Sequence, residues 1–107
     1  MTKEELFAQF DNDIKNNDIV VYMKGNKNFP QCGFSGMIAH IFQTLGKDFK
    51  DINVLEDDNI RNGIKDYNNW PTIPQTFVKG EFIGGCDFVK EMFETGELAK
   101  LLKDNDL

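Results

Sequence analysis

The chain has 107 residues, 40% of them hydrophobic and 28% charged, which predicts a single soluble globular domain that spans residues 1–107. Twelve Lys and Arg against 18 Asp and Glu leave a net charge of −6, which argues against a nucleic-acid partner and against attraction to anionic membranes. There is no apolar run of membrane-spanning length and no signal-peptide pattern at the N-terminus, so we expect a cytoplasmic protein with free thiols.

The first quarter of the chain predicts a capped helix followed by a buried strand. Thr2 and Glu5 have the spacing of a capping box, and apolar residues continue at helical spacing until an Asn-Asn-Asp sequence at residues 16–18 breaks the helix. The apolar run Ile19–Met23 has a β-branched centre, which is typical of a strand that is buried on both faces of a sheet.

A loop, a second helix and a second strand are predicted next. Residues 24–31 contain Gly, Asn and Pro, which favour a loop. Apolar positions recur at helical spacing from Phe34, and Gly46 marks the end of this helix. Residues 49–54 predict the second strand.

The second half of the chain predicts a helix, a β-hairpin and two further helices. Asp57 and Asp58 can cap the first of these helices, and the two prolines in residues 70–74 require an extended segment. Residues 76–83 have the pattern of a hairpin with glycine in its turn, and Asp87 can cap the helix that follows. This order predicts an α/β fold with a mixed four-stranded sheet, helices on both faces, a parallel first pair of strands and an antiparallel hairpin.

Cys32 is the first candidate for chemistry. The chain has two cysteines and one histidine, so a four-ligand zinc site within one chain is not expected. Cys32 lies between a predicted strand and a predicted helix, where free backbone N–H groups and the helix dipole stabilise a thiolate. Lys24 and Lys27 could add positive charge, so we expect a reactive or metal-ligating thiol. His40 is expected to face solvent and has no assigned role.

Four sequence blocks stand out together: Lys24-Gly25 with Pro30, Cys32-Gly33-Phe34-Ser35, Trp70-Pro71-Thr72-Ile73-Pro74-Gln75, and Gly84-Gly85-Cys86-Asp87. In this order and at these spacings they resemble the monothiol glutaredoxins of the CGFS type, from about Asp18 to about Lys103. Two positions depart from the pattern of that family. Asn26 stands where Ser or Thr is commoner, and Thr76 stands where an apolar residue is usual.

The resemblance implies the thioredoxin fold and a glutathione-binding site. Lys24 and Arg61 would pair with glutathione carboxylates, and the backbone of Ile73 would pair with the cysteinyl unit in the manner of an added strand. The N–H groups of Cys86 and Asp87 would receive the other carboxylate, with the Asp87 side chain near the amino group of the ligand. It also implies a cis peptide bond before the second proline of the Trp-Pro block.

Ser35 stands where dithiol oxidoreductases carry their resolving cysteine, and a hydroxyl cannot attack a disulfide as a thiolate does. A [2Fe–2S] cluster held by thiolates needs four sulfurs, of which two chains supply two through Cys32. The resemblance implies that two glutathione molecules supply the others and that the cluster bridges two protomers. A rival ligand set consists of Cys32 and Cys86 from each of two chains.

Three hypotheses follow for the function. The first is an iron–sulfur carrier, in which a glutathione-dependent homodimer binds one [2Fe–2S] cluster through Cys32 and delivers it to acceptor apoproteins, with a BolA-like protein as a further partner implied by the resemblance. The second is a glutathione-dependent thiol–disulfide oxidoreductase, in which Cys32 is the nucleophile that removes glutathione from proteins. The third is a redox sensor in which Cys32 and Cys86 form a regulatory disulfide.

Overall fold

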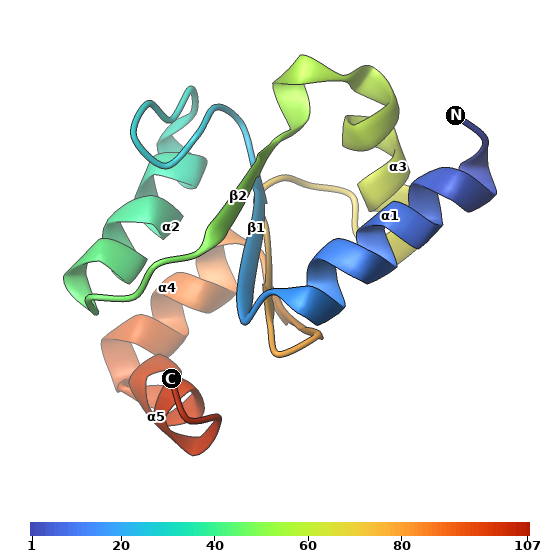
Figure 1. The fold of residues 1–107 in the computed structure, drawn as a ribbon. Coiled ribbons are helices and arrows are strands. Elements are labelled where there is room, and N and C mark those ends of the chain that lie inside the picture. Colours follow the sequence, from blue (N-terminus) through green and yellow to red (C-terminus); the bar gives the residue numbers. More distant parts are fainter.

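The computed structural model describes residues 1–107, whose strands form one four-stranded sheet (Figure 1). The strands are β1 (Ile19–Met23), β2 (Lys50–Asn53), β3 (Gln75–Val78) and β4 (Glu81–Gly84). Their order in the sheet is β2-β1-β3-β4, with β1 parallel to β2 and antiparallel to β3, and with β4 antiparallel to β3. This arrangement confirms the predicted mixed sheet, its parallel first pair of strands and its antiparallel hairpin.

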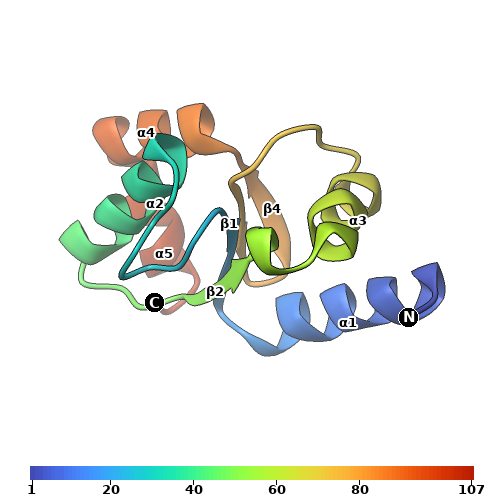
Figure 2. The ribbon, with the colours of Figure 1, turned by 90° about the horizontal axis from the view of Figure 1, so that it is seen from above.

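Helices cover both faces of this sheet. They are α1 (Lys3–Asn16), α2 (Gly33–Thr44), the short 3-10 helix η1 (Val54–Glu56), α3 (Asp58–Asn68), α4 (Cys86–Thr95) and α5 (Glu97–Asp104). Figures 1 and 2 show α1 and α3 on one side of the sheet and α2, α4 and α5 on the other. None of the helices is long and apolar enough to cross a bilayer.

The central strand β1 supplies side chains to two apolar cores. Ile19, Val21 and Met23 pack in the core beneath α2, α4 and α5, whereas Val20 and Tyr22 pack in the core beneath α1 and α3. Successive side chains of a strand point to opposite faces, so a central strand covered by helices on both sides is apolar at every position. All five residues of β1 are buried, which confirms the prediction made from the unbroken apolar run.

The predicted starts of helices α1 and α3 are confirmed. The Thr2 hydroxyl accepts a hydrogen bond from the Glu5 N–H at 3.1 Å, and the Glu5 carboxylate accepts one from the Thr2 N–H at 3.2 Å. The side chain of Asp57 caps α3 by accepting from the Asn59 N–H at 2.8 Å.

Two boundaries differ from the sequence prediction. Helix α4 begins at Cys86 with Gly85 as its N-cap, so the prediction that Asp87 caps this helix is wrong. Gly85 has an extended backbone that lets the chain turn into the helix two residues earlier than expected. Val54, predicted to end a strand, instead opens η1, where the Asn53 side chain accepts a hydrogen bond from the Leu55 N–H at 3.0 Å.

Candidate functional site

The sheet topology brings four distant segments to one end of the molecule. Strands β1, β2 and β4 all run toward this end, and they are followed there by the loop to α2, by η1 and by the start of α4 (Figure 1). Strand β3 runs the opposite way, so the segment before it, with its cis Ile73–Pro74 peptide bond, lies at the same end. The cis bond that the resemblance implied is therefore present.

Cys32 is the N-cap residue of α2 and is half-buried. The pKa of its thiol is lowered chiefly because the backbone N–H of Ser35 donates a hydrogen bond to the sulfur. The Phe34 N–H, the Lys24 ammonium and the Ser35 hydroxyl act in the same direction, and burial opposes them. The site therefore favours the thiolate, as expected for a cysteine at a helix N-terminus.

Ser35 connects the cysteine to the end of β1. Its side chain is fully buried, and its hydroxyl oxygen accepts a hydrogen bond from the Lys24 N–H at 3.0 Å. A hydroxyl can accept one hydrogen bond while donating another, so the same group also contacts the sulfur of Cys32. Ser35, which stands at the position of a resolving cysteine, therefore helps to hold the Cys32 thiol in place.

The thiol of Cys86 has an electrostatic environment opposite to that of Cys32. Cys86 is the first residue of α4, and burial raises the pKa of its thiol. The negative charges of Asp87 and Cys32 raise this pKa further, whereas Lys90 lowers it. The two cysteines are therefore close enough to interact electrostatically, and no disulfide joins them.

We expect iodoacetamide to alkylate Cys32 faster than Cys86 at neutral pH, because the thiolate is the nucleophile and only Cys32 has a lowered pKa. The alkylation rate should reach half its maximum at a pH below the ordinary thiol range of about 8.5 for Cys32 and above it for Cys86. Mass spectrometry over a pH series measures both rates, with Cys86→Ser and Cys32→Ser as single-thiol controls. A faster reaction at Cys86 would contradict this assignment.

A groove of about 280 Å³ opens beside Cys86, and Cys32 itself is not among the residues that line it. Three of the five residues predicted to bind glutathione, Ile73, Cys86 and Asp87, line it. The full lining consists of Phe34, Trp70, Thr72, Ile73, Pro74, Gly85, Cys86, Asp87 and Phe88. The backbone N–H and C=O of Ile73 make no hydrogen bond within the chain, so both are available to an extended peptide in this groove.

The other two predicted residues, Lys24 and Arg61, do not line the groove. Lys24 is close enough to Cys32 to stabilise its thiolate. Arg61 lies near the start of α3, which begins at the same end of the sheet. Neither side chain takes part in an ion pair, since the three ion pairs of the structure are Lys27–Asp48, Lys79–Asp18 and Lys100–Asp104. Both cations are therefore without a carboxylate partner in the chain.

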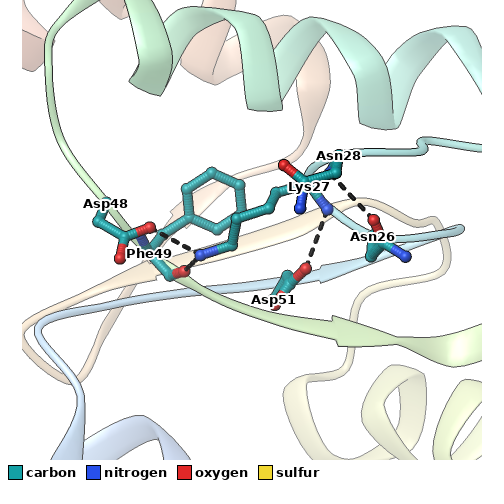
Figure 3. Close-up of polar contacts among 6 residues, drawn as sticks. All are labelled: Asn26, Lys27, Asn28, Asp48, Phe49 and Asp51. Carbon is teal, nitrogen blue, oxygen red and sulfur yellow. Dashed lines mark hydrogen bonds and ion pairs between the residues drawn. The ribbon is translucent and has the colours of Figure 1, made fainter.

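Lys27 does not add positive charge at the thiol as the sequence suggested. Its ammonium group lies 2.7 Å from an Asp48 carboxylate oxygen and above the Phe49 ring, 4.7 Å from the ring centroid (Figure 3). The residue is instead bound to strand β2 and the segment before it.

Sequence reasoning missed the aromatic walls of the groove. Phe34 was assigned to the apolar face of its helix, yet 61% of its surface is exposed, and 57% of the surface of Phe88 is exposed as well. Trp70 packs edge-on against Phe82 and Phe88, and its indole N–H is buried without a partner. Helical periodicity cannot distinguish a first-turn residue that lines a groove from one that fills the core. The Trp-Pro block was the one feature of the sequence that could have indicated a groove beside these residues.

The two helices that begin at this site have no side-chain oxygen as a cap. At α2 the acceptor is the sulfur of Cys32 itself and at α4 there is none, whereas Thr2 caps α1 and Asp57 caps α3. The first four N–H groups of a helix have no partner within the helix and can bind a thiolate or a carboxylate. No three His, Cys, Asp or Glu side chains of the chain converge as they would at a metal site.

Comparisons with known proteins agree on the family and the fold. The glutaredoxin family model matches residues 19–83. A probable monothiol glutaredoxin 2 of Rickettsia conorii is 47% identical over 103 residues, which cover 96% of each chain. The reduced apo form of poplar GrxS14 superposes with a TM-score of 0.85 at 39% identity, covering 97% of this chain and 96% of that one. A buckwheat glutaredoxin–glutathione complex gives a TM-score of 0.83 at 25% identity, with 95% and 91% covered. The fold is therefore thioredoxin-like, as predicted.

Proposed function

Since this chain belongs to the glutaredoxin family and is a monothiol glutaredoxin, we propose that it binds glutathione and, as a homodimer, carries a [2Fe–2S] cluster to acceptor apoproteins. The observation that carries this proposal is the pairing of one activated thiol with a buried serine. Cys32 has a lowered pKa, and Ser35 stands at the position of a resolving thiol. Such a site can hold a ligand through one sulfur but cannot resolve a mixed disulfide by itself.

Glutathione fits the groove as an extended peptide. The unpaired N–H and C=O of Ile73 would bind its cysteinyl unit, and the uncapped N-terminus of α4, at Cys86 and Asp87, would receive one carboxylate. Lys24 and Arg61, which have no carboxylate partner in the chain, would pair with a glutathione carboxylate. The ligand thiol would then lie beside Cys32. The buckwheat relative forms a complex with glutathione, which supports glutathione as the ligand.

Counting sulfur ligands leads from glutathione binding to a dimer. Four thiolates hold a [2Fe–2S] cluster, and each chain contributes one from Cys32. The raised pKa of Cys86 supports glutathione over the rival ligand set of four protein thiols, because a protonated, half-buried thiol is a poor metal ligand. A cluster held partly by noncovalently bound glutathione can leave the site, as delivery to another protein requires.

The surface around Cys32 suits protein partners. Four of the five large apolar side chains that are exposed, Phe29, Phe34, Leu55 and Phe88, belong to segments at the Cys32 end of the molecule. Exposed apolar groups gathered near a reactive centre are typical of a docking surface. We assign this surface to acceptor apoproteins and to a BolA-like protein.

Anaerobic reconstitution with iron and sulfide, with and without glutathione, tests the proposal. We expect visible absorption and a dimeric mass only when glutathione is present. A coloured dimer that forms without glutathione would replace the ligand set with the four protein thiols. Failure to form a stable cluster under any condition would overturn the carrier function, and rapid turnover of a glutathione mixed disulfide by colourless monomer would then establish the oxidoreductase.

A further inference from the structure

The loop before Cys32 forms a small hairpin, which hydrogen bonds and an ion pair hold against strand β2 and the segment before it. Gly25 pairs with Pro30 across the hairpin, and the Asn26 side chain accepts hydrogen bonds from the N–H groups of Asn28 and Phe29 at 3.0 and 2.9 Å. Gly25 has φ +85, and a Cβ atom there would lie 2.5 Å from the Phe29 carbonyl oxygen, so the turn requires glycine. The hairpin therefore has a defined shape of its own.

Lys27 ties the tip of this hairpin to the edge of the sheet (Figure 3). Its backbone N–H donates to an Asp51 carboxylate oxygen at 2.9 Å. Its ammonium donates to Asp48 at 2.7 Å and to the Phe49 carbonyl, and it also lies over the Phe49 ring. Only 26% of the Lys27 side chain is exposed, so this long side chain is held along its length rather than left in solvent.

Asn53 joins the base of the hairpin to the next segment of the site. Its side-chain oxygen accepts hydrogen bonds from the Gly25 N–H and from the Leu55 N–H, each at 3.0 Å. Gly25 follows Lys24, and Leu55 belongs to η1, which leads into α3 and Arg61. One oxygen atom at the end of β2 therefore connects the two segments that carry the unpaired cations.

We infer that Asn53 and Lys27 are positioning residues for glutathione, because they fix the hairpin and η1 on β2 and thereby set where Lys24 and Arg61 meet the ligand. This inference rests on the proposed glutathione site. A loop that is ordered before binding does not lose conformational entropy when the ligand binds, so the ligand is held more tightly. A shift of Lys24 would also reach Cys32 through its charge and through Ser35, but that effect acts equally on every mixed disulfide of Cys32.

The test measures how strongly the folded protein retains a glutathionyl group. In a Cys86→Ser background, the Cys32 thiolate attacks glutathione disulfide. The sulfur–sulfur bond of glutathione disulfide breaks, the Cys32–glutathione disulfide forms, and one glutathione thiolate leaves and takes up a proton. Mass spectrometry at equilibrium gives the equilibrium constant. The same measurement with hydroxyethyl disulfide, which has no carboxylate, reports on Cys32 without the glutathione contacts.

We expect Asn53→Leu and Lys27→Met each to lower the equilibrium constant with glutathione disulfide about fivefold, the scale of one lost hydrogen bond. The constant with hydroxyethyl disulfide should fall less, because it reports only the change at Cys32 that both disulfides share. Asn53→Asp keeps an oxygen acceptor and should match the parent protein. Thr2→Val, which removes an equivalent side-chain acceptor at the distant α1 cap, should also match it.

Parent-like constants for both Asn53→Leu and Lys27→Met would overturn the positioning role, and so would an equal loss in Asn53→Asp or with hydroxyethyl disulfide. If Asn53→Leu does not fold, Lys27→Met alone tests the positioning role. If the parent protein itself shows no preference for glutathione disulfide over hydroxyethyl disulfide, the proposed glutathione site fails and this inference fails with it.

Discussion

Replacing Cys32 with serine is expected to abolish cluster assembly, because each protomer would lose its only activated thiolate. The serine hydroxyl remains protonated at neutral pH and does not replace a thiolate as an iron ligand. Reconstitution with iron, sulfide and glutathione should then leave a colourless protein, and the dimeric species should be absent from a mass measurement. Retention of the visible chromophore in this variant would exclude Cys32 as the ligand.

Cys86→Ser is the matched control for that experiment. Cys86 lies beside the same groove, but burial and the charge of Asp87 raise the pKa of its thiol. We expect this variant to form the same glutathione-dependent coloured dimer as the parent protein. Loss of colour in both single variants would favour the ligand set made of four protein thiols. A disulfide between Cys32 and Cys86 under mild oxidation, absent from either variant, would instead support the redox-sensor hypothesis.

Phe10→Ala should be among the most destabilising single substitutions in the chain. Phe10 is 1% exposed and packs against the aromatic rings of Phe7, Tyr22 and Tyr67 in the core beneath α1 and α3. Removing a buried phenylalanine ring leaves a cavity and typically lowers the free energy of unfolding by about 3–5 kcal/mol. Denaturant titration followed by circular dichroism measures this change.

Phe29→Ala provides the control with the same chemistry. Phe29 lies on the hairpin before Cys32 and is 71% exposed, so its removal should change the free energy of unfolding by no more than about 0.5 kcal/mol. A similar loss of stability in the two variants would show that burial in the α1 and α3 core is not what makes Phe10 important.

Local sequence patterns were sufficient for most of the fold. The capping box at Thr2, the unbroken apolar run of β1 and the extended Trp-Pro block each describe the conformation of a few neighbouring residues. These patterns placed the principal helices and all four strands within a few residues of their positions. The order of the elements then allowed few topologies, because a strand–helix–strand unit is parallel and a tight hairpin is antiparallel.

The place of the candidate site was predictable from the sequence, but its local structure was predictable only in part. The resemblance on four sequence blocks led to Cys32, Ile73, Cys86 and Asp87, which lie together at one end of the sheet. The expected cap at Asp87 was wrong, because Gly85 lets α4 begin earlier. Propensities describe which residues favour a helix start, but the start itself depends on where the preceding strand leaves the sheet.

The direction of individual side chains was decided only in three dimensions. Lys27 was expected near the thiol, yet Asp48, before β2, and Asp51, in β2, hold it at the edge of the sheet. Asn53 gave no signal in the sequence, although its side chain binds Gly25, which is 28 residues away. Helical and strand periodicity reports only which face of an element is buried. Contacts between distant segments depend on how the parallel pairing of β1 and β2 brings their ends together, and this register becomes visible only when the sheet has formed.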